Sequence, residues 1–147
     1  MIDLPQFNLL GEDLLVVKAT NDQGNEELSD LDFTIIDNTN PVITVNEVFA
    51  QSPNAIGTPF SRFDYSVTDN YELSLVKREI LKVDGSGNET GLYYSSETNI
   101  PLFEKTHNYS VDFELTSGNE GANYRARITA TDAAGNVEIW TSAVMKL

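Results

Sequence analysis

The stretch that decides the fold is YRARITA, residues 124–130. Aromatic or aliphatic residues occupy every second position, and two arginines and a threonine stand between them. Because alternate side chains of a β-strand point to opposite faces, this pattern predicts a strand with one buried face. The same period recurs in residues 31–35, 62–68 and 109–115, so strands dominate the chain.

Turn-forming residues separate these runs at short intervals. Clusters rich in Gly, Asn, Asp and Pro occupy residues 21–25, 38–41, 52–59, 84–88, 117–123 and 132–136. No segment shows a convincing 3.6-residue period over three turns of helix. Many short strands joined by such turns predict an all-β fold, an antiparallel sandwich or barrel.

The composition of the chain excludes several classes of function. Its 147 residues carry a formal net charge of −14, which would repel nucleic acid and anionic membranes. There is no cysteine, so thiol chemistry, cysteine-based metal sites and disulfides are excluded, and there is one histidine. No apolar run reaches the roughly 18–20 residues that a membrane helix needs. No catalytic motif is present, and we expect no enzyme, no nucleic-acid partner and no membrane insertion.

A short phrase occurs twice along the chain. Residues 19–25 read ATNDQGN and residues 130–136 read ATDAAGN, at a spacing of 111 residues. Each follows an aliphatic strand and precedes another, so each predicts a hairpin in which Gly adopts the positive φ of the turn. A period near 110 residues matches the size of one β-sandwich domain.

Three segments together resemble one known family. They are ATDAAGNVE at 130–138, DNTNPVITV at 37–45, and VTDN at 67–70 followed by LV at 75–76 and VDG at 83–85. In this order they resemble the bacterial immunoglobulin-like (Big-type) domains, which form tandem arrays in surface adhesins. The resemblance implies an immunoglobulin-like antiparallel β-sandwich with Greek-key topology over residues 37–147. It implies that residues 1–36 are the last strands of a preceding repeat.

The resemblance also assigns strands and a core. It implies strands at 42–48, 61–68, 74–83, 108–116, 123–131 and 137–146, with further pieces in 89–103, and Tyr124 as a tyrosine corner whose hydroxyl bonds to upstream backbone. Strict alternation places Trp140 on the outer face. The expected core comprises Ile43, Val45, Phe63, Tyr65, Val67, Leu75, Leu81, Val111, Phe113, Leu115, Tyr124, Ile128, Val137 and Ile139.

The strongest candidate site is a cluster of Asp and Asn side chains. In such a sandwich the start of the first strand and two of the loops meet at one pole. These segments hold Asp37, Asn38, Asp69, Asn70, Asp132 and Asn136. Carboxylate and amide oxygens are the ligands of Ca²⁺, so we expect a calcium site that stiffens the junction with the preceding repeat. The alternative is that these residues only form turns, because Asn and Asp are common turn residues.

Other residues carry weaker hypotheses. Trp140, Tyr93 and Tyr94 are candidate contacts for a glycan or a protein partner, because exposed aromatic rings bind such surfaces. Residues 84–88, DGSGN, fail the EF-hand pattern and indicate a Gly-rich hairpin. His107 lies in a connection between strands, where a lone histidine is usually solvated.

These observations favour a non-catalytic module outside the cell or at its surface, with no signal peptide in the sequence itself. We expect a spacer or adhesive domain of a bacterial surface or filament protein. The alternative is a glycan-binding module or an accessory domain of a secreted polysaccharide-degrading enzyme. Three strands in residues 1–36, near 4–10, 14–20 and 28–36, cannot close a sandwich. Neighbouring repeats, the main domain or a second copy of the chain could complete them by strand pairing.

Overall fold

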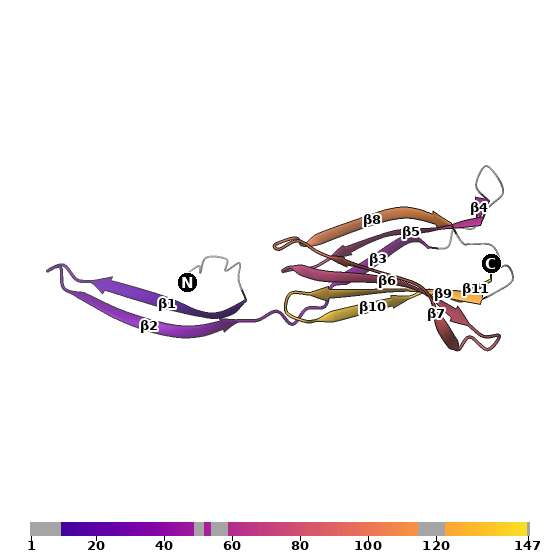
Figure 1. Ribbon diagram of the computed structural model, residues 1–147. Helices are drawn as coiled ribbons and strands as arrows, with labels where there is room; N and C mark the ends of the chain where they lie inside the picture. The colour runs from indigo at the N-terminus through magenta and orange to yellow at the C-terminus, as the bar shows by residue number, and fades with distance from the viewer. Residues whose placement is uncertain (1–9, 49–51, 54–58, 115–122, 147) are drawn as a thin grey trace. The chain divides into compact units, whose positions relative to one another are not determined.

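The chain divides into two compact units, Met1–Asn38 and Thr39–Leu147. The structure, a computed structural model, describes residues 10–48, 52–53, 59–114 and 123–146. All regular elements in these ranges are β-strands (Figure 1).

The first unit contains one β-hairpin. β1 (Gly11–Thr20) pairs with β2 (Glu26–Ile35) in antiparallel fashion over ten residue pairs, from Gly11 opposite Ile35 to Thr20 opposite Glu26. The strands predicted at 14–20 and 28–36 therefore exist and are longer than expected. The strand predicted near residues 4–10 lies outside the described residues.

The second unit contains the remaining strands. They are β3 (Val42–Val48), β4 (Ser52–Pro53), β5 (Pro59–Thr68), β6 (Leu73–Val83), β7 (Glu89–Asn99), β8 (Thr106–Glu114), β9 (Asn123–Asp132), β10 (Val137–Thr141) and β11 (Met145–Lys146). Most bounds lie within two residues of the predicted strands. The last predicted strand, 137–146, is divided into β10 and β11.

Two antiparallel sheets build this unit (Figure 1). In the β5 sheet, β5 pairs with β3, β4 and β8. In the β6 sheet, the strand order is β10-β9-β6-β7, and β11 also pairs with β9. Every pairing is antiparallel, so the predicted all-β class is confirmed, and the two sheets are consistent with a β-sandwich.

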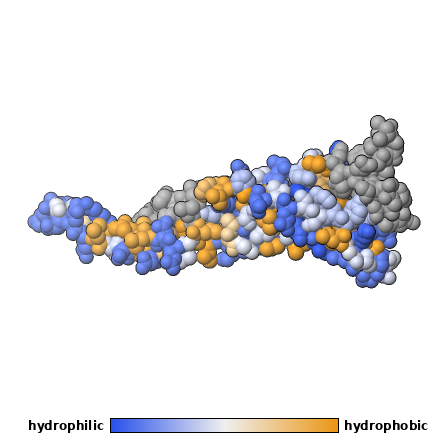
Figure 2. Space-filling view, viewed as in Figure 1, coloured by the Kyte–Doolittle hydropathy of each residue, from blue (hydrophilic) through white to orange (hydrophobic). Residues whose placement is uncertain are grey.

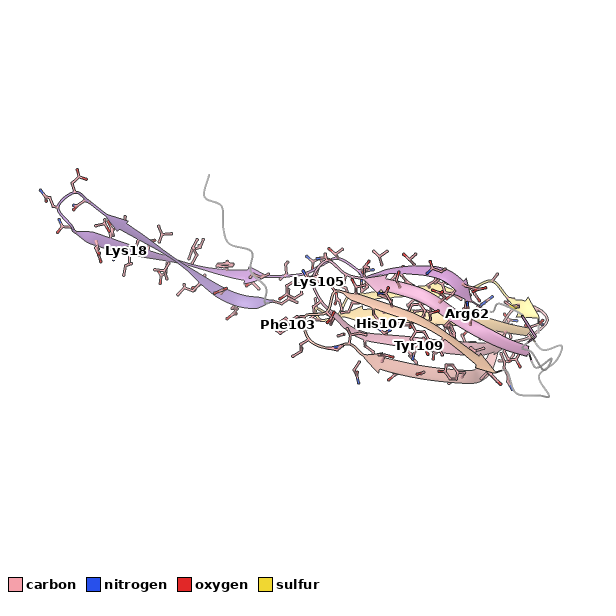
Figure 3. All side chains as sticks on the ribbon, turned by 90° about the horizontal axis from the view of Figure 1, so that it is seen from above. Lys18, Arg62, Phe103, Lys105, His107 and Tyr109 are labelled. Atoms are coloured by element: carbon pink, nitrogen blue, oxygen red, sulfur yellow. The ribbon has the colours of Figure 1, made fainter. Side chains whose placement is uncertain are left out.

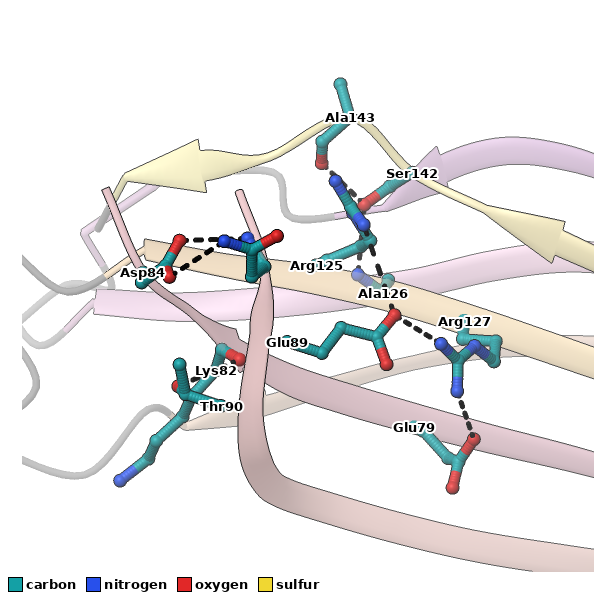
Figure 4. A network of polar contacts seen from close by, with 11 residues as sticks. Glu79, Lys82, Asp84, Glu89, Thr90, Arg125, Ala126, Arg127, Ser142 and Ala143 are labelled. Carbon is teal, nitrogen blue, oxygen red and sulfur yellow. Dashed lines mark hydrogen bonds and ion pairs between the residues drawn. The ribbon is translucent and has the colours of Figure 1, made fainter. Parts of the chain in front are cut away.

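The core lies between the two sheets. Its buried cluster draws Phe63, Tyr65 and Val67 from β5, together with apolar residues of β6 and β9. On β9 the residues Tyr124, Ala126, Ile128 and Ala130 are fully buried, as the alternation in YRARITA predicts. The arginines between them face outward, and Arg127 forms ion pairs with Glu79 and Glu89 on that face (Figure 4).

A buried arginine, which the sequence pattern did not reveal, bridges the two sheets. Arg78 of β6 is 3% exposed, and its Nη1 donates to the Tyr65 hydroxyl of β5 at 3.1 Å. Two hydroxyls of β7 accept its other hydrogen bonds, Thr98 Oγ1 at 3.1 Å and Ser96 Oγ at 2.8 Å. Its guanidinium carbon lies 4.0 Å from the centre of the Tyr109 ring, a cation–π contact. The groups that these contacts place around the buried Arg78 guanidinium are therefore neutral.

The predicted orientation of β10 is wrong. Trp140 packs against the core, whereas Val137 and Ile139 are 43% and 57% exposed. The register gives the reason, because Trp140 lies directly opposite the buried Ile128 of β9, and directly opposed residues of an antiparallel pair share a face. Val111 of β8, also predicted in the core, is 44% exposed.

The other core predictions divide into three groups. Phe63, Tyr65, Val67, Tyr124, Ile128 and Leu81 are buried, Ile43 and Val45 pack against the core, and Leu75 is half-buried. The side chains of Phe113 and Leu115 lie outside the described residues. Tyr124 is fully buried, but its hydroxyl has no hydrogen-bond partner among the described residues, so the tyrosine corner stays a prediction. Residues 115–122, just upstream, are not among them.

We predict that the two faces of β10 differ sharply in their sensitivity to truncation. Trp140→Ala should lower the free energy of unfolding by about 2–3 kcal/mol, because it removes a large, partly buried side chain from the core. Ile139→Ala should cost less than about 1 kcal/mol, because that side chain is mostly exposed. Urea unfolding followed by far-UV circular dichroism measures both. Equal losses would contradict the register of β10.

Candidate metal centre

Three loops and the start of β3 meet at one end of the second unit. Val42 begins β3 opposite Thr68, the last residue of β5. Leu73 begins β6 opposite Asp132, the last residue of β9. The β5–β6 and β9–β10 loops therefore lie at the same end, which we call the Asp pole.

The β7–β8 loop also belongs to the Asp pole, which sequence reasoning missed. The Glu104 carbonyl accepts a hydrogen bond from Leu73 N at 2.8 Å, and the Lys105 carbonyl accepts one from Asp69 N at 2.9 Å. The Lys105 ammonium donates to the Asn70 carbonyl at 3.0 Å. Figure 3 labels Lys105 in this loop. A positive charge thus lies beside the predicted ligands.

Asp132 is fixed by its own hairpin. Its side chain is almost fully buried, with 2% of the residue exposed. One carboxylate oxygen accepts the backbone N–H of Asn136 and the other accepts the Asn136 side-chain amide, both at 2.7 Å. Ser74 Oγ donates to the Asp132 carbonyl at 2.8 Å, from a bulge in β6. These contacts hold the carboxylate rigidly, and each oxygen keeps a second lone pair.

The two carboxylate oxygens of Asp69 differ in their hydrogen bonding. Asp69 Oδ1 accepts the backbone N–H groups of Tyr71 at 2.8 Å and Glu72 at 2.9 Å, which closes the turn into β6. Asp69 Oδ2 is buried and has no hydrogen-bond partner among the described residues. A buried carboxylate oxygen without a partner is costly, so this atom is the strongest indication of a missing ligand.

The two carboxylates form a close pair. An oxygen of Asp69 and an oxygen of Asp132 lie within 4.8 Å of each other. Two unit charges at that distance repel by about 3 kcal/mol at an effective dielectric constant near 20. Within the described ranges, no lysine or arginine forms an ion pair with either residue. A cation bound between them would remove the repulsion and satisfy Asp69 Oδ2.

The remaining predicted ligands differ in their roles. The Asn136 side chain donates to Asp132, so it acts in the turn. The Asn70 carbonyl accepts from Lys105. Asp37 and Asn38 end the first unit and stay predicted ligands. The pair Asp69–Asp132 is thus the part of the site that the second unit itself brings together.

The turn chemistry at Asp132 occurs twice more in the chain. In all three hairpins the first residue donates its backbone N–H to the carbonyl of the residue four positions later, at Asn21, Asp84 and Asp132. The first side chain accepts from backbone N–H groups of the same turn each time. Figure 4 shows two of the hydrogen bonds that the Asp84 carboxylate accepts. The phrase shared by residues 19–25 and 130–136 is therefore explained by the turn itself.

The three aromatic candidates lie against the core. Tyr93, Tyr94 and Trp140 are half-buried and pack on the buried cluster. The Tyr93 ring meets the Tyr124 ring edge to face, with centroids 5.4 Å apart. These positions favour a packing role over a contact for a glycan.

His107 lies on β8 and is half-buried rather than simply solvated. Its ring centre lies 6.1 Å from that of Tyr65 and 6.3 Å from that of Tyr109 (Figure 3). Its Nε2 is buried without a hydrogen-bond partner in the described part of the chain. Burial, and then the positive charge of Arg78, lower the pKa of His107 below its ordinary value of 6.5.

Comparison with known proteins adds no functional assignment. No protein-family model and no curated protein matches the chain. In the described ranges no helix has the length and apolar character needed to cross a membrane.

We predict that the hairpins depend on one glycine each. Gly135 has φ +91°, so Gly135→Ala should cost about 1–2 kcal/mol of stability, because a side chain is strained in that region. The matched control is Gly85→Ala, since Ala133 occupies the equivalent position of the Asp132 hairpin. A Cβ at Gly85 has open space, so this change should be neutral or slightly stabilising. Thermal unfolding compares the two, and a larger loss at Gly85 would contradict the shared turn geometry.

A second prediction concerns pH. Because the folded state lowers the pKa of His107, the unfolded chain binds the proton more readily. The contribution of His107 to stability is therefore present above pH 6.5 and lost as the pH falls through the folded-state pKa. Between pH 7.5 and pH 5, the wild-type chain should lose more unfolding free energy than His107→Gln, measured by urea unfolding. The carboxylates titrate in both proteins, so identical losses would exclude this role for the only histidine.

Proposed function

We propose that the second unit is an immunoglobulin-like module of a bacterial surface protein, with a spacer or adhesive role outside the cell. We assign no catalytic activity to this unit. Its mechanism is mechanical, since a packed sandwich can extend or present a neighbouring domain. The first unit, on this proposal, supplies the final strands of a preceding repeat.

The strand order supports the immunoglobulin-like part of the proposal. In chain order, the first long strand (β3) and the second (β5) share a sheet with β8. The third long strand (β6) joins β7, β9 and β10 in the other sheet. In immunoglobulin-like sandwiches the chain likewise passes from one antiparallel sheet to the other, and the loops lie at the two ends.

We propose further that Ca²⁺ binds at the Asp pole. The observation that carries this proposal is the buried Asp69 Oδ2, which lacks a hydrogen-bond partner in the described part of the chain and lies beside the buried carboxylate of Asp132. Ca²⁺ takes six to eight oxygen ligands, so backbone carbonyls and water would complete its shell. Bound there, it would join the β5–β6 and β9–β10 loops and stiffen this end of the module.

Asp37 and Asn38 are proposed as additional ligands from their place in the sequence. They stand three or four residues before Pro41, which is fully buried in the second unit. A ligand from this segment would couple calcium binding to the junction between the units, which is the property a stiff spacer requires.

The test is thermal unfolding of the calcium-free chain with and without 2 mM CaCl₂. Calcium at 100-fold above its Kd would add about 2.7 kcal/mol to the stability of the folded state. We therefore expect a clear rise in Tm of the second unit. Asp69→Asn should abolish the rise, because it removes the charge of the unpaired oxygen. Asp37→Asn should weaken calcium binding, because it removes the charge of a proposed ligand.

The control is Asp84→Asn, which changes the equivalent turn residue of another hairpin and belongs to no group of acidic side chains, among the described residues, that is close enough to hold a metal ion. This variant should keep the full calcium response. Because the chain is strongly acidic, NaCl at equal ionic strength measures the effect of screening alone, and MgCl₂ measures the general binding of divalent cations. Superimposable melting curves with chelator and with calcium would refute the metal site. An equal response in Asp69→Asn would also refute it.

A further inference from the structure

Lys105 binds the β5–β6 loop at two points of its own structure. Its carbonyl accepts the backbone N–H of Asp69 at 2.9 Å, and its ammonium donates to the carbonyl of Asn70 at 3.0 Å. The same ammonium lies 5.9 Å from the centre of the Tyr71 ring, within the range of a cation–π contact. The side chain of Lys105 therefore lies along the loop that carries Asp69.

The contacts of this ammonium are not those of an ordinary surface ion pair. Within the described residues Lys105 forms no ion pair with a carboxylate, although Glu104 precedes it in the chain. Other cations of the chain do form ion pairs with glutamates, among them Lys18, Arg62, Lys77 and Arg127. The positive charge of Lys105 is instead held by a neutral backbone oxygen next to Asp69.

That oxygen is of the kind that calcium binds. Ca²⁺ takes backbone carbonyl oxygens as ligands at about 2.3–2.6 Å, together with carboxylates. The Asn70 carbonyl belongs to the residue next to Asp69, whose buried Oδ2 carries the calcium proposal. Two cations held by one loop also repel each other. Calcium at the Asp pole must therefore displace the ammonium or bind against its charge.

We infer that Lys105 is an intramolecular competitor of Ca²⁺ at the Asp pole. Its charge weakens calcium binding, and its ammonium leaves the Asn70 carbonyl when the ion binds. This inference rests on the proposed calcium site and names the residue that sets the affinity of that site. The competition moves the Kd toward the range of roughly 10⁻⁴–10⁻³ M that is typical of extracellular modules.

Lys82 provides a matched control for the loss of one positive charge. Its ammonium lies 5.8 Å from the centre of the Tyr93 ring, a geometry close to that of Lys105 over Tyr71. Lys82 follows Leu73, the first residue of β6, by nine positions, which places it about 30 Å from the Asp pole. At 0.15 M salt the Debye length is only about 8 Å, so its charge is screened from the site.

This control is needed because the whole chain attracts cations. Its formal net charge is −14. Figure 2 shows hydrophilic residues on many parts of the visible surface of the second unit. Loss of any lysine therefore raises the general attraction of calcium to the protein, and only an effect specific to Lys105 supports the inference.

The experiment is calorimetric titration of the full, chelator-treated chain with CaCl₂ in 150 mM NaCl. Lys105→Gln removes the charge and keeps an amide that can donate to the Asn70 carbonyl. We expect this variant to lower the Kd for Ca²⁺ at least about fivefold, because a positive charge close to a divalent ion is removed. Lys105→Arg keeps the charge and should stay within about twofold of the wild type. Lys82→Gln should also stay within about twofold.

Displacement of the ammonium is measured separately by NMR on the chain labelled with ¹³C-lysine. The CεH₂ resonance of Lys105, assigned by its loss in Lys105→Arg, should shift during the calcium titration with the Kd found by calorimetry. The resonance of Lys82 should not move. A Lys105 resonance that stays in place while the site saturates would overturn the displacement.

The remaining outcomes separate the inference from the calcium site itself. Binding by the wild type with an unchanged Kd in Lys105→Gln would overturn the inference and leave the calcium site intact. Equal tightening in Lys105→Gln and Lys82→Gln would assign the effect to net charge and overturn it as well. Weaker binding by Lys105→Gln would make Lys105 a support of the loop rather than a competitor. Absence of binding in both the wild type and Lys105→Gln would refute the calcium site.

Discussion

The second unit depends on one constraint, that the one charge buried between its two sheets in the described residues must be held by polar partners. Most of the space between the sheets is filled by alternate side chains of β5, β6 and β9. Arg78 is the exception, because a buried guanidinium loses its hydration unless hydrogen bonds replace it. The hydroxyls of Tyr65, Ser96 and Thr98 bind its two terminal nitrogens and the face of Tyr109 covers it, while Nε has no hydrogen-bond partner among the described residues. The polar side of the interior therefore lies toward β7 and β8, while its apolar side lies toward β9.

This division explains which parts of the fold could be predicted from sequence. The strands with strict alternation, above all YRARITA, were predicted correctly because one buried face dictates their pattern. The orientation of β10 was predicted wrongly because its five residues place large apolar side chains on both faces. The register with β9 decides which face points inward. Arg78 could not be recognised, since an isolated charge in a strand reads as a solvent-facing position. Only the hydroxyls contributed by β5 and β7, distant in sequence, make its burial possible.

The candidate site shows a similar limit. Alternating strand directions suffice to bring Asp69 and Asp132 to one end, so their proximity follows from topology. The β7–β8 loop, with Lys105, was missed because no motif marks it. That Asp69 Oδ2 stays unsatisfied depends on atomic positions within the loop and could not be predicted. The repeated phrase at 19–25 and 130–136 carried less information than its length suggests. The same turn, with the same backbone hydrogen bonds, recurs at Asp84 in a different context.

The position of Trp140 makes it a built-in optical reporter. It is the only tryptophan of the chain, and it packs against the core of the second unit directly opposite Ile128. Its emission therefore reports the packing of that unit alone, while the hairpin of β1 and β2 contributes no tryptophan signal. Far-UV circular dichroism reports the strands of both units. Comparing the two signals during one unfolding experiment separates loss of the sandwich from loss of the hairpin, with no label and no truncation of the chain.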